Sequence, residues 1–404
     1  MYRRKKKAIP TGVLVAIIAV CVIVAVFAIV NLAKNGTETP ETDTHTKQVA
    51  TNKNNTVTPS NTNPDITEEP TGAEPTSVPD AGYDFRVCFC GDINFDETYY
   101  PMQKLNSVGG DLTKCISPEL LEIMNNADVM VANNEFTYTN RGTPLAGKAW
   151  TFRADPKRVS LLKEMGVDVA LLANNHAYDY GEESLIDTMQ TLKDAGIQYF
   201  GAGYNLDEAK APLYLTVDGK TIALVAASRA EKNFKTPQAT DEKPGILLCY
   251  DTEIFVASIK EARQHADFVI AVVHWGTEYS NELEPVQEET AKLYIDAGAD
   301  AIIGAHSHCP QPIDFYNGKP IVYSLSNFWF NDTPLDSMLI ELHFYGDDSK
   351  NEHHMDLIYT AATQHDVHTE YCYGADREKV VAFMEKISGN KIKIDNDGLV
   401  TPVR

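Results

Sequence analysis

Five short polar clusters, each directly after an apolar run, most constrain how this chain can fold. The apolar runs cover residues 86–90, 129–132, 169–173, 268–273 and 301–304, and they are typical of buried strands. The clusters that follow are Gly91-Asp92-Ile93-Asn94, Asn133-Asn134-Glu135, Asn174-Asn175-His176, His274-Trp275-Gly276-Thr277-Glu278 and Gly304-Ala305-His306-Ser307-His308. In α/β sheets, ligands bind beyond the carboxyl ends of strands, so we expect the five clusters to converge on one cleft.

The converging side chains are those that bind divalent metal ions. The expected metal ligands are Asp92, Glu135, Asn175, His274, His306 and His308. A single histidine or aspartate after a strand is more often structural or a helix cap, but five clusters in one domain favour a site. Two histidines at i and i+2 lie on the same side of an extended segment, so each can serve a different ion. Oxygen and imidazole ligands suit Mn²⁺, Zn²⁺ or Fe. The sequence therefore predicts one or two divalent ions.

His176 and Asp179 form a candidate catalytic pair beside these ligands. An imidazole that is oriented by a carboxylate can donate a proton to a leaving group. The alternative is that Asp179 caps a helix that begins near Gly181, with His176 packed behind the site.

Further polar residues are candidates for substrate contact or for support of the ligands. They are Asn94, Asn134, Arg141, Arg153, Glu278 and Asn327. Cations near the cleft of an acidic protein suggest recognition of an anionic substrate, although solvated loop charges are an equal alternative. Four other histidines are expected on the surface without a metal: His353, His354, His365 and His368.

The charge balance excludes one class of partner. Lys and Arg total 35 against 57 Asp and Glu, which gives a net charge of −22. Nucleic-acid binding needs clustered cations to neutralise phosphates, so we expect no nucleic-acid partner. An anionic polymer would also be repelled, unless a bound cation reversed the local field.

The first residues predict a membrane anchor. Five basic residues at positions 3–7 precede an apolar stretch at 11–30, which is long enough to cross a hydrocarbon core of ~30 Å as a helix. The basic flank stays cytoplasmic. We therefore expect a cytoplasmic tail at 1–10, a transmembrane anchor at 11–32 and a single-pass cell-membrane protein with its remaining chain outside. A cleaved signal peptide is the alternative, but no Ala-x-Ala site follows the apolar stretch.

The rest of the chain divides into a linker and an α/β domain. Residues 33–82 are rich in Thr, Asn, Pro and Glu, and such a composition predicts a disordered tether. Strand and helix signals then alternate, and Asp-Gly and Asn-Gly turns at 218–219 and 317–318 predict hairpins. This order indicates two packed sheets with helices outside. We expect the domain at 83–345 and a C-terminal extension at 346–404 packing on it. Helices are expected at 117–126, 156–165, 181–195, 252–265, 285–297 and 377–387. Further strands are expected at 213–217, 221–227, 311–316, 320–325, 337–344 and 354–360.

The five clusters, together with Tyr323-Ser324-Leu325-Ser326-Asn327-Phe328, resemble the motifs of bacterial capsule-synthesis proteins of the CapA, or poly-γ-glutamate biosynthesis, type. The resemblance covers roughly residues 85–330. Proteins of this type are similar to calcineurin-like metallophosphoesterases. The resemblance thus implies a four-layer αββα sandwich, here preceded by the N-terminal transmembrane helix.

The phosphoesterase likeness also implies a role for each ligand. Asp92 and His308 would hold one metal, Glu135 would bridge, and Asn175, His274 and His306 would hold the second, with His176 as proton donor. Three positions depart from the expected patterns. Asn94 stands where phosphoesterases place a histidine, Glu135 replaces a bridging aspartate, and Ser326 stands where the capsule family usually has glycine. An amide is a weaker ligand than an imidazole, so the first metal is expected to bind loosely or not at all.

The resemblance implies a membrane-anchored extracellular protein of capsule biosynthesis. Its cleft would hydrolyse or transfer an anionic polymer or a phosphoester. The alternative is a non-catalytic binding or export component of a capsule assembly complex. The expected partners are an anionic cell-surface polymer or its precursor, the membrane, and other capsule-synthesis membrane proteins.

Overall fold

The computed structural model describes residues 82–231 and 235–403. The expected cytoplasmic tail at 1–10 and anchor at 11–32 lie outside the described residues, as does the expected tether through residue 81. Within the two described ranges, no helix combines the length and the apolar composition needed to cross a bilayer.

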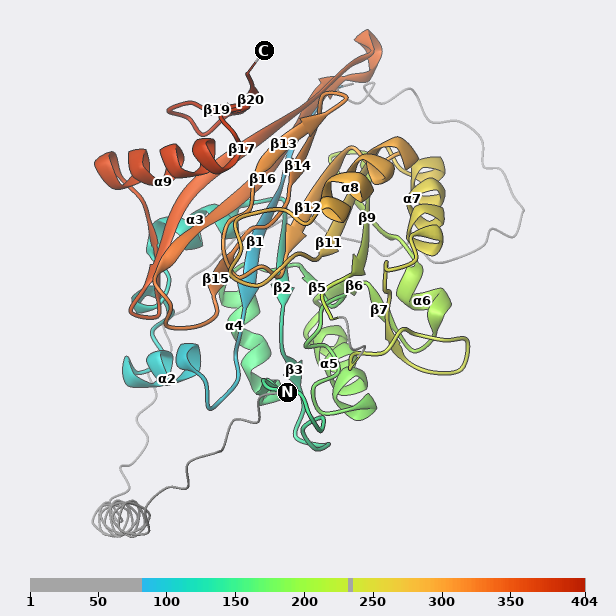
Figure 1. The fold of residues 1–404 in the computed structure, drawn as a ribbon, viewed down its shortest axis with the longest axis vertical. Helices are drawn as coiled ribbons and strands as arrows, with labels where there is room; N and C mark the ends of the chain where they lie inside the picture. The colour runs from blue at the N-terminus through green and yellow to red at the C-terminus, as the bar shows by residue number, and fades with distance from the viewer. Residues whose placement is uncertain (1–81, 232–234, 404) are drawn as a thin grey trace, which may run out of the picture. The chain divides into compact units, whose positions relative to one another are not determined.

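The first sheet has eight strands in the order β18-β17-β16-β1-β2-β5-β6, with β15 also paired to β1 (Figure 1). Its parallel half is β1 (Gly82–Ile93), β2 (Val129–Asn134), β5 (Val169–Leu171) and β6 (Gln198–Phe200). Its antiparallel half is β16 (Leu335–Asp347), β17 (Glu352–His365) and β18 (His368–Tyr371), and β15 spans Asn327–Trp329. The carboxyl ends of β1, β2 and β5 therefore lie at one edge.

The second sheet has six strands in the order β13-β14-β12-β11-β9-β8. They are β8 (Leu213–Val217), β9 (Lys220–Ser228), β11 (Phe268–His274), β12 (Ala301–Ala305), β13 (Ile313–Tyr316) and β14 (Lys319–Val322). The two predicted hairpins, β8–β9 and β13–β14, are confirmed. The turn residues Asp218, Gly219, Asn317 and Gly318 have φ of 47°, 77°, 51° and 77°. Such turns match the twist of the strands that they join.

The helices agree with the expected ranges to within a few residues. They are α2 (Tyr100–Ser107), α3 (Pro118–Asn126), α4 (Val159–Glu164), α5 (Glu182–Ala195), α6 (Leu206–Lys210), α7 (Glu253–His265), α8 (Pro285–Ala297) and α9 (Gly374–Ile387). The 3₁₀ turns are η1 (Leu112–Lys114), η2 (Pro156–Arg158) and η3 (Asp348–Lys350). Short strand pairs are β3 (Thr137–Tyr138) with β4 (Arg153–Ala154), β7 (Ala202–Gly203) with β10 (Gly245–Ile246), and β19 (Ile392–Ile394) with β20 (Val400–Pro402). The two short helices α2 and α6 were not expected.

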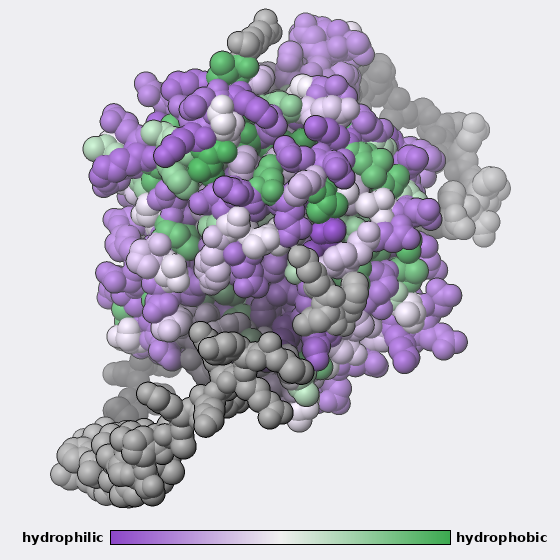
Figure 2. Space-filling view, viewed as in Figure 1, coloured by the Kyte–Doolittle hydropathy of each residue, from purple (hydrophilic) through white to green (hydrophobic). Residues whose placement is uncertain are grey.

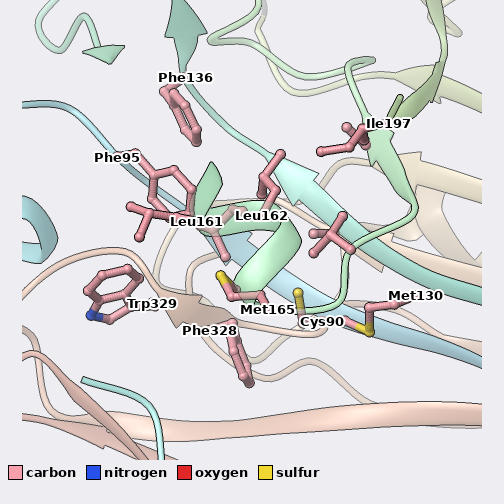
Figure 3. Close-up of a cluster of buried hydrophobic side chains, with 14 of the residues drawn as sticks. Cys90, Phe95, Met130, Phe136, Leu161, Leu162, Met165, Ile197, Phe328 and Trp329 are labelled. Carbon is pink, nitrogen blue, oxygen red and sulfur yellow. The ribbon is translucent and has the colours of Figure 1, made fainter. Parts of the chain in front are cut away.

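Three buried clusters define four layers: helices, sheet, sheet and helices. One cluster lies between the first sheet and α2 to α5, a second between the two sheets, and a third between the second sheet and α7 and α8. The alternation of β1 explains the first two, because Cys88 faces the helices while Phe89 faces the other sheet. Figure 3 shows part of the first cluster, where Cys90 of β1 lies beside Met165, the residue that follows α4. A strand that is buried on both faces reads as a continuous apolar run, which is the pattern seen in the sequence.

The last residues are more closely integrated than a separate extension. The expected boundary at 345 falls inside β16, and β17 and β18 continue the first sheet. On the inner face of this sheet, α9 contributes Val380 and Met384 to the cluster that also contains Tyr359 of β17. Residues 346–404 thus supply strands to the sheet as well as a packed helix.

The surface is mainly polar, as the composition requires. Figure 2 shows that hydrophilic residues predominate on the face drawn there, with hydrophobic residues in small scattered groups. Scattered apolar side chains are normal on a folded protein and indicate no partner by themselves.

Candidate metal centre

The strand ends bring side chains from both sheets to one place. Asp92 lies at the end of β1, opposite Asn133 of β2, and Glu135 follows β2 directly. His274 ends β11 of the second sheet, opposite Ala305 of β12. His306 and His308 follow β12, and Asn175 lies in the loop after β5. The structure therefore brings these ligand candidates together from strand ends of two sheets.

Two motif glycines permit this approach. A Cβ on Gly91 would lie 1.9 Å from the carbonyl oxygen of Ser326, where the Asp92 N–H donates a hydrogen bond at 3.0 Å. A Cβ on Gly304 would lie 1.9 Å from the carbonyl oxygen of Tyr323. A side chain at either position would push neighbouring backbone away, so these glycines set how closely the loops pack.

The acidic and imidazole groups form two triads that share Glu135. One triad is Asp92, Glu135 and His308, and the other is Glu135, His274 and His306. In each triad the ligand atoms lie within 4.8 Å of one another, and all five side chains are buried. The Glu135 Oε1 atom lies 3.6 Å from His274 Nε2 and 3.9 Å from His308 Nε2. Glu135 is thus placed where a bridging carboxylate of a two-ion centre belongs.

Unsatisfied atoms show that the residues fit divalent cations. Asp92 Oδ2, Glu135 Oε1 and His306 Nδ1 are buried without a hydrogen-bond partner among the described residues. His308 Nδ1 lies 3.1 Å from Asp92 Oδ2, but its aligned hydrogen bond goes to Asn327 Oδ1 at 2.8 Å. A buried polar atom without a partner costs about 1–3 kcal/mol, and cations bound at the two triads would offset that cost. Oxygen and imidazole donors suit Mn²⁺, Zn²⁺ or Fe.

Burial and neighbouring charges shift the pKa values of four of the ligands. Burial, and then the charge of Asp92, raise the pKa of Glu135 well above its usual value. Burial, and then neighbouring imidazoles, lower the pKa values of His274 and His306 well below the usual value. Burial also opposes charge on His308, but the hydrogen bond and charge of Asp92 reverse this effect and raise its pKa. The surroundings therefore disfavour the charged forms of Glu135, His274 and His306 and favour the charged form of His308.

Asn133 connects the ligands by hydrogen bonds, a role that was not expected from the sequence. Its Nδ2 donates to Asp92 Oδ1 at 2.6 Å and lies 3.3 Å from both Glu135 Oε2 and His274 Nδ1. Asn174 Nδ2 in turn donates to Asn133 Oδ1 at 3.1 Å. The side chain of Asn134, the residue that was singled out, donates instead to the Phe136 carbonyl at 2.8 Å. The two-residue period of an extended segment was the available signal, because it places Asn133 on the side of Glu135.

His176 lies at the centre and is oriented from behind. Its Nδ1 contacts Asp179 Oδ2 at 2.7 Å, and its Nε2 lies 3.9 Å from Glu135 Oε1. Asp179 is itself fixed by the Phe152 N–H at 2.7 Å and by Lys148 Nζ at 2.7 Å. Lys148 is only 7% exposed and also donates to the backbone carbonyl of Asn175. Asp179 therefore orients the ring, and Lys148 links this pair to the ligand loop.

Three of the other candidates lie at or next to the ligands. Asn175 Oδ1 contacts His274 Nε2 at 2.7 Å, so two expected ligands of one ion already touch. Asn327 supports His308, as described above, and its Nδ2 has no partner among the described residues. Asn94 is fully buried, and its Oδ1 accepts the Asp96 N–H at 2.8 Å. The oxygen of Asn94 is thus partly engaged in holding the backbone.

The two arginines do not join the cluster. Arg141 pairs with Glu183 at 3.2 Å and with Asp187 at 2.6 Å, both on α5. Arg153 lies over the Tyr180 ring, 4.3 Å from its centroid. Neither side chain lines the cleft beside the ligands.

A cleft of about 650 Å³ opens onto the centre. Asn175, His176, His306 and Glu278 are among the residues that line it. Its remaining lining includes Lys148, Trp150, Arg229, Glu231, Thr277 and Glu284. The charged walls are mixed, so positive charge for binding an anion would have to come mainly from bound metal ions.

Backbone strain is concentrated at the same place. His306, His308 and Ser326 have φ of 98°, 53° and 69°, in the left-handed region that favours glycine. Each such residue costs on the order of 1–3 kcal/mol, and such residues cluster at functional sites. A glycine at position 326 would adopt this backbone conformation without the strain that Ser326 has.

The protein is therefore a four-layer α/β sandwich. Its candidate metal centre is built around one buried carboxylate that two ligand triads share. Comparison with known sequences gives the family. The sequence model of the bacterial capsule synthesis protein PGA_cap matches residues 86–332, so this chain belongs to that family. The matched range contains every expected metal ligand.

Two curated relatives have capsule-related names. The PGA biosynthesis protein CapA of Bacillus subtilis is 39% identical over 215 residues, which are 52% of this chain and 55% of that protein. The capsule biosynthesis protein CapA of Bacillus anthracis is 38% identical over 197 residues, 47% of each chain. The chain thus spans about half the length of the curated relatives that it matches.

Among solved structures, the NAD nucleotidase of Haemophilus influenzae is similar, with 12% sequence identity and a TM-score of 0.39. The match covers 76% of this chain and 63% of that chain. A likeness at this level carries no functional argument.

Proposed function

We propose that this protein is a membrane-anchored, extracellular protein of poly-γ-glutamate-type capsule biosynthesis. In this proposal its metal cleft hydrolyses or transfers an anionic polymer, its precursor or a phosphoester. Membership of the capsule synthesis family supports the biological setting. The observation that carries the chemistry is the position of Glu135, which two ligand triads share.

The ligands divide between two ions in the proposal. Asp92 and His308 would hold one, His274 and His306 with Asn175 would hold the other, and Glu135 would be shared between them. Divalent ions in such a site act as Lewis acids toward a bound anionic group. Asn133 keeps the two carboxylates in place by donating hydrogen bonds to both.

The protein's own proton donor is His176. A carboxylate can only accept, so Nδ1 of the ring carries the hydrogen that faces Asp179 at 2.7 Å. Nε2 then faces the centre and the cleft, where it can hold a proton for a leaving group. Burial lowers the pKa of His176, and the charge of Asp179 opposes this shift.

Asn94 favours the second candidate function, that of a non-catalytic binding or export component. Its buried amide oxygen already accepts the Asp96 N–H, and an amide is a weak metal ligand. A protein that kept only the second ion firmly could still use the cleft to bind an anionic chain.

An activity assay separates the two candidates. We expect the purified full-length protein to cleave a generic aryl phosphodiester or a poly-γ-glutamate chain when Mn²⁺ is present. Activity should disappear with EDTA and return with Mn²⁺. His353→Ala is a suitable control, because His353 is exposed and distant in sequence from every ligand. Absence of activity on both substrates, with metal bound, would decide for the non-catalytic component.

The proposed location has its own test. With residues 1–10 in the cytoplasm and 11–32 as the anchor, the segment 33–82 lies outside the membrane. Protease added to intact, wall-stripped cells should then cut this segment and release a soluble acidic fragment. Cleavage that occurs only after lysis would contradict the proposed topology.

A further inference from the structure

The hairpin between β17 and β18 places two histidines directly opposite each other. Its turn consists of Asp366 and Val367, with φ of 50° and 59°, which is the geometry of a tight two-residue hairpin turn. His365 and His368 flank this turn as a paired position, and Thr363 pairs with Glu370 two positions further from the turn. Residues two apart share a face of a strand, so His368 and Glu370 project together.

These three side chains form a compact ligand cluster outside the buried centre. The ligand atoms of His365, His368 and Glu370 all lie within 4.8 Å of one another. His365 Nε2 lies 2.8 Å from Glu370 Oε2, and the two imidazole ring centroids are 6.2 Å apart. The side chains of His365 and Glu370 are 46% and 51% exposed, so small rotations can close them around an ion.

The hairpin is held firmly at its base. The Trp329 indole N–H donates to the Val367 carbonyl at 3.1 Å. The Ser117 N–H donates to the Thr369 carbonyl at 2.9 Å, which joins β18 to the start of α3. Val367 is a β-branched residue in the left-handed region, a strained conformation that persists only where the surroundings impose it. The register that pairs the histidines is therefore fixed before any ligand binds.

The local charge favours a cation. Asp366 Oδ2 lies 3.9 Å from His365 Nδ1, too far for a hydrogen bond but near enough to add negative charge beside the ring. His365 and Glu370 line a groove of about 590 Å³ that also contains Asp336. The groove's Lys379 is paired with Asp376 at 2.8 Å.

One of the two histidines, His368, is shifted toward its neutral form. Partial burial lowers the pKa of His368, Glu370 opposes this shift, and His365 and Lys104 add to it. A neutral imidazole is the form that binds metal.

We propose that His365, His368 and Glu370 bind one divalent transition-metal ion of the Zn²⁺ type, independently of the buried centre. Two imidazoles and a carboxylate are a known ligand set for Zn²⁺ with an open position for water or a further ligand. Two of the three ligands line the groove, which would give a further ligand access to the ion. The sequence alone predicted His365 and His368 as metal-free surface residues. The register of the hairpin is what brings them together with Glu370.

The test counts Zn²⁺ ions on the full-length protein. In the His306→Ala/His308→Ala background, which lacks two ligands of the buried centre, we expect one Zn²⁺ per chain by isothermal titration and elemental analysis. Adding His368→Gln should remove that ion. The matched control adds His353→Gln and His354→Gln instead, which removes two exposed histidines from the other end of β17, and it should keep the ion.

A second comparison avoids any dependence on the buried centre. His365→Gln/His368→Gln in the otherwise unchanged chain should bind one Zn²⁺ fewer than the wild type, with the same circular dichroism spectrum. Equal Zn²⁺ content with and without His365 and His368, in either background, would overturn the proposal.

Discussion

Replacing His306 and His308 together with alanine should abolish metal binding at the buried centre. The two changes remove one imidazole from each triad. Each triad then keeps only Glu135 and one other ligand. The experiment is best done in the His365→Gln/His368→Gln background, so that the hairpin contributes no ion. Metal is counted by elemental analysis after loading with Mn²⁺ or Zn²⁺ and gel filtration.

The control for this pair removes the same number of histidines elsewhere. His353→Ala/His354→Ala changes two exposed residues of β17 and should leave the metal content at the parent value. A parent protein without metal after loading, or an unchanged content in the double variant, would reject the centre. A parent value near one ion per chain would agree with weak binding at the side of Asn94.

His176→Ala should lower turnover by about 10²–10⁴-fold, the usual effect of losing a positioned acid or base. The metal content should not change, because His176 belongs to neither triad. Turnover is measured with Mn²⁺ on whichever substrate the wild type cleaves, and metal is counted on the same sample. Unchanged turnover would refute the proton-donor role.

Two further variants separate the proton donor from the residues that orient it. Asp179→Asn keeps the size of the side chain and should lower turnover less than His176→Ala, because the ring remains in place. Lys148→Met removes the ammonium group that contacts Asp179 and the Asn175 carbonyl, and it should act in the same direction. In both variants, the plot of turnover against pH should keep the limb that the His176 imidazole produces. In His176→Ala that limb should disappear.

The sequence predicted the sheets well, because each signal was local. Apolar runs such as 86–90 and 301–304 lie inside observed strands, and the Asp218-Gly219 and Asn317-Gly318 turns form the two predicted hairpins. Short helices such as α6 were not expected, because their five residues are too few to show a period. The sequence did not show that the expected boundary at 345 falls inside β16. This strand pairs with β1, which lies at the opposite end of the described residues, so no local signal marks the pairing.

The centre was predictable in its ligands but not in its supporting residues. Asp92, Glu135 and the histidines follow apolar runs, and this position can be recognised from the sequence alone. Asn133 and Lys148 act through contacts with residues far along the chain, so only the folded structure shows their partners. Arg141 likewise pairs with α5 through a tertiary contact, which the residues next to it in the sequence do not predict.

The origin of the ligands in different sheets gives the metal a second consequence. Asp92 and Glu135 belong to the first sheet and the three ligand histidines to the second, so bound ions would tie the two halves of the sandwich together. All the cysteines of the described residues are free, so ions are the available cross-links there. A ligand that binds only the folded state at 100 times its Kd adds about 2.7 kcal/mol to stability. The free energy of unfolding of the domain would therefore depend on the concentration of metal ions around it. In the same way, the stability of a disulfide-bonded protein depends on the redox potential of its surroundings.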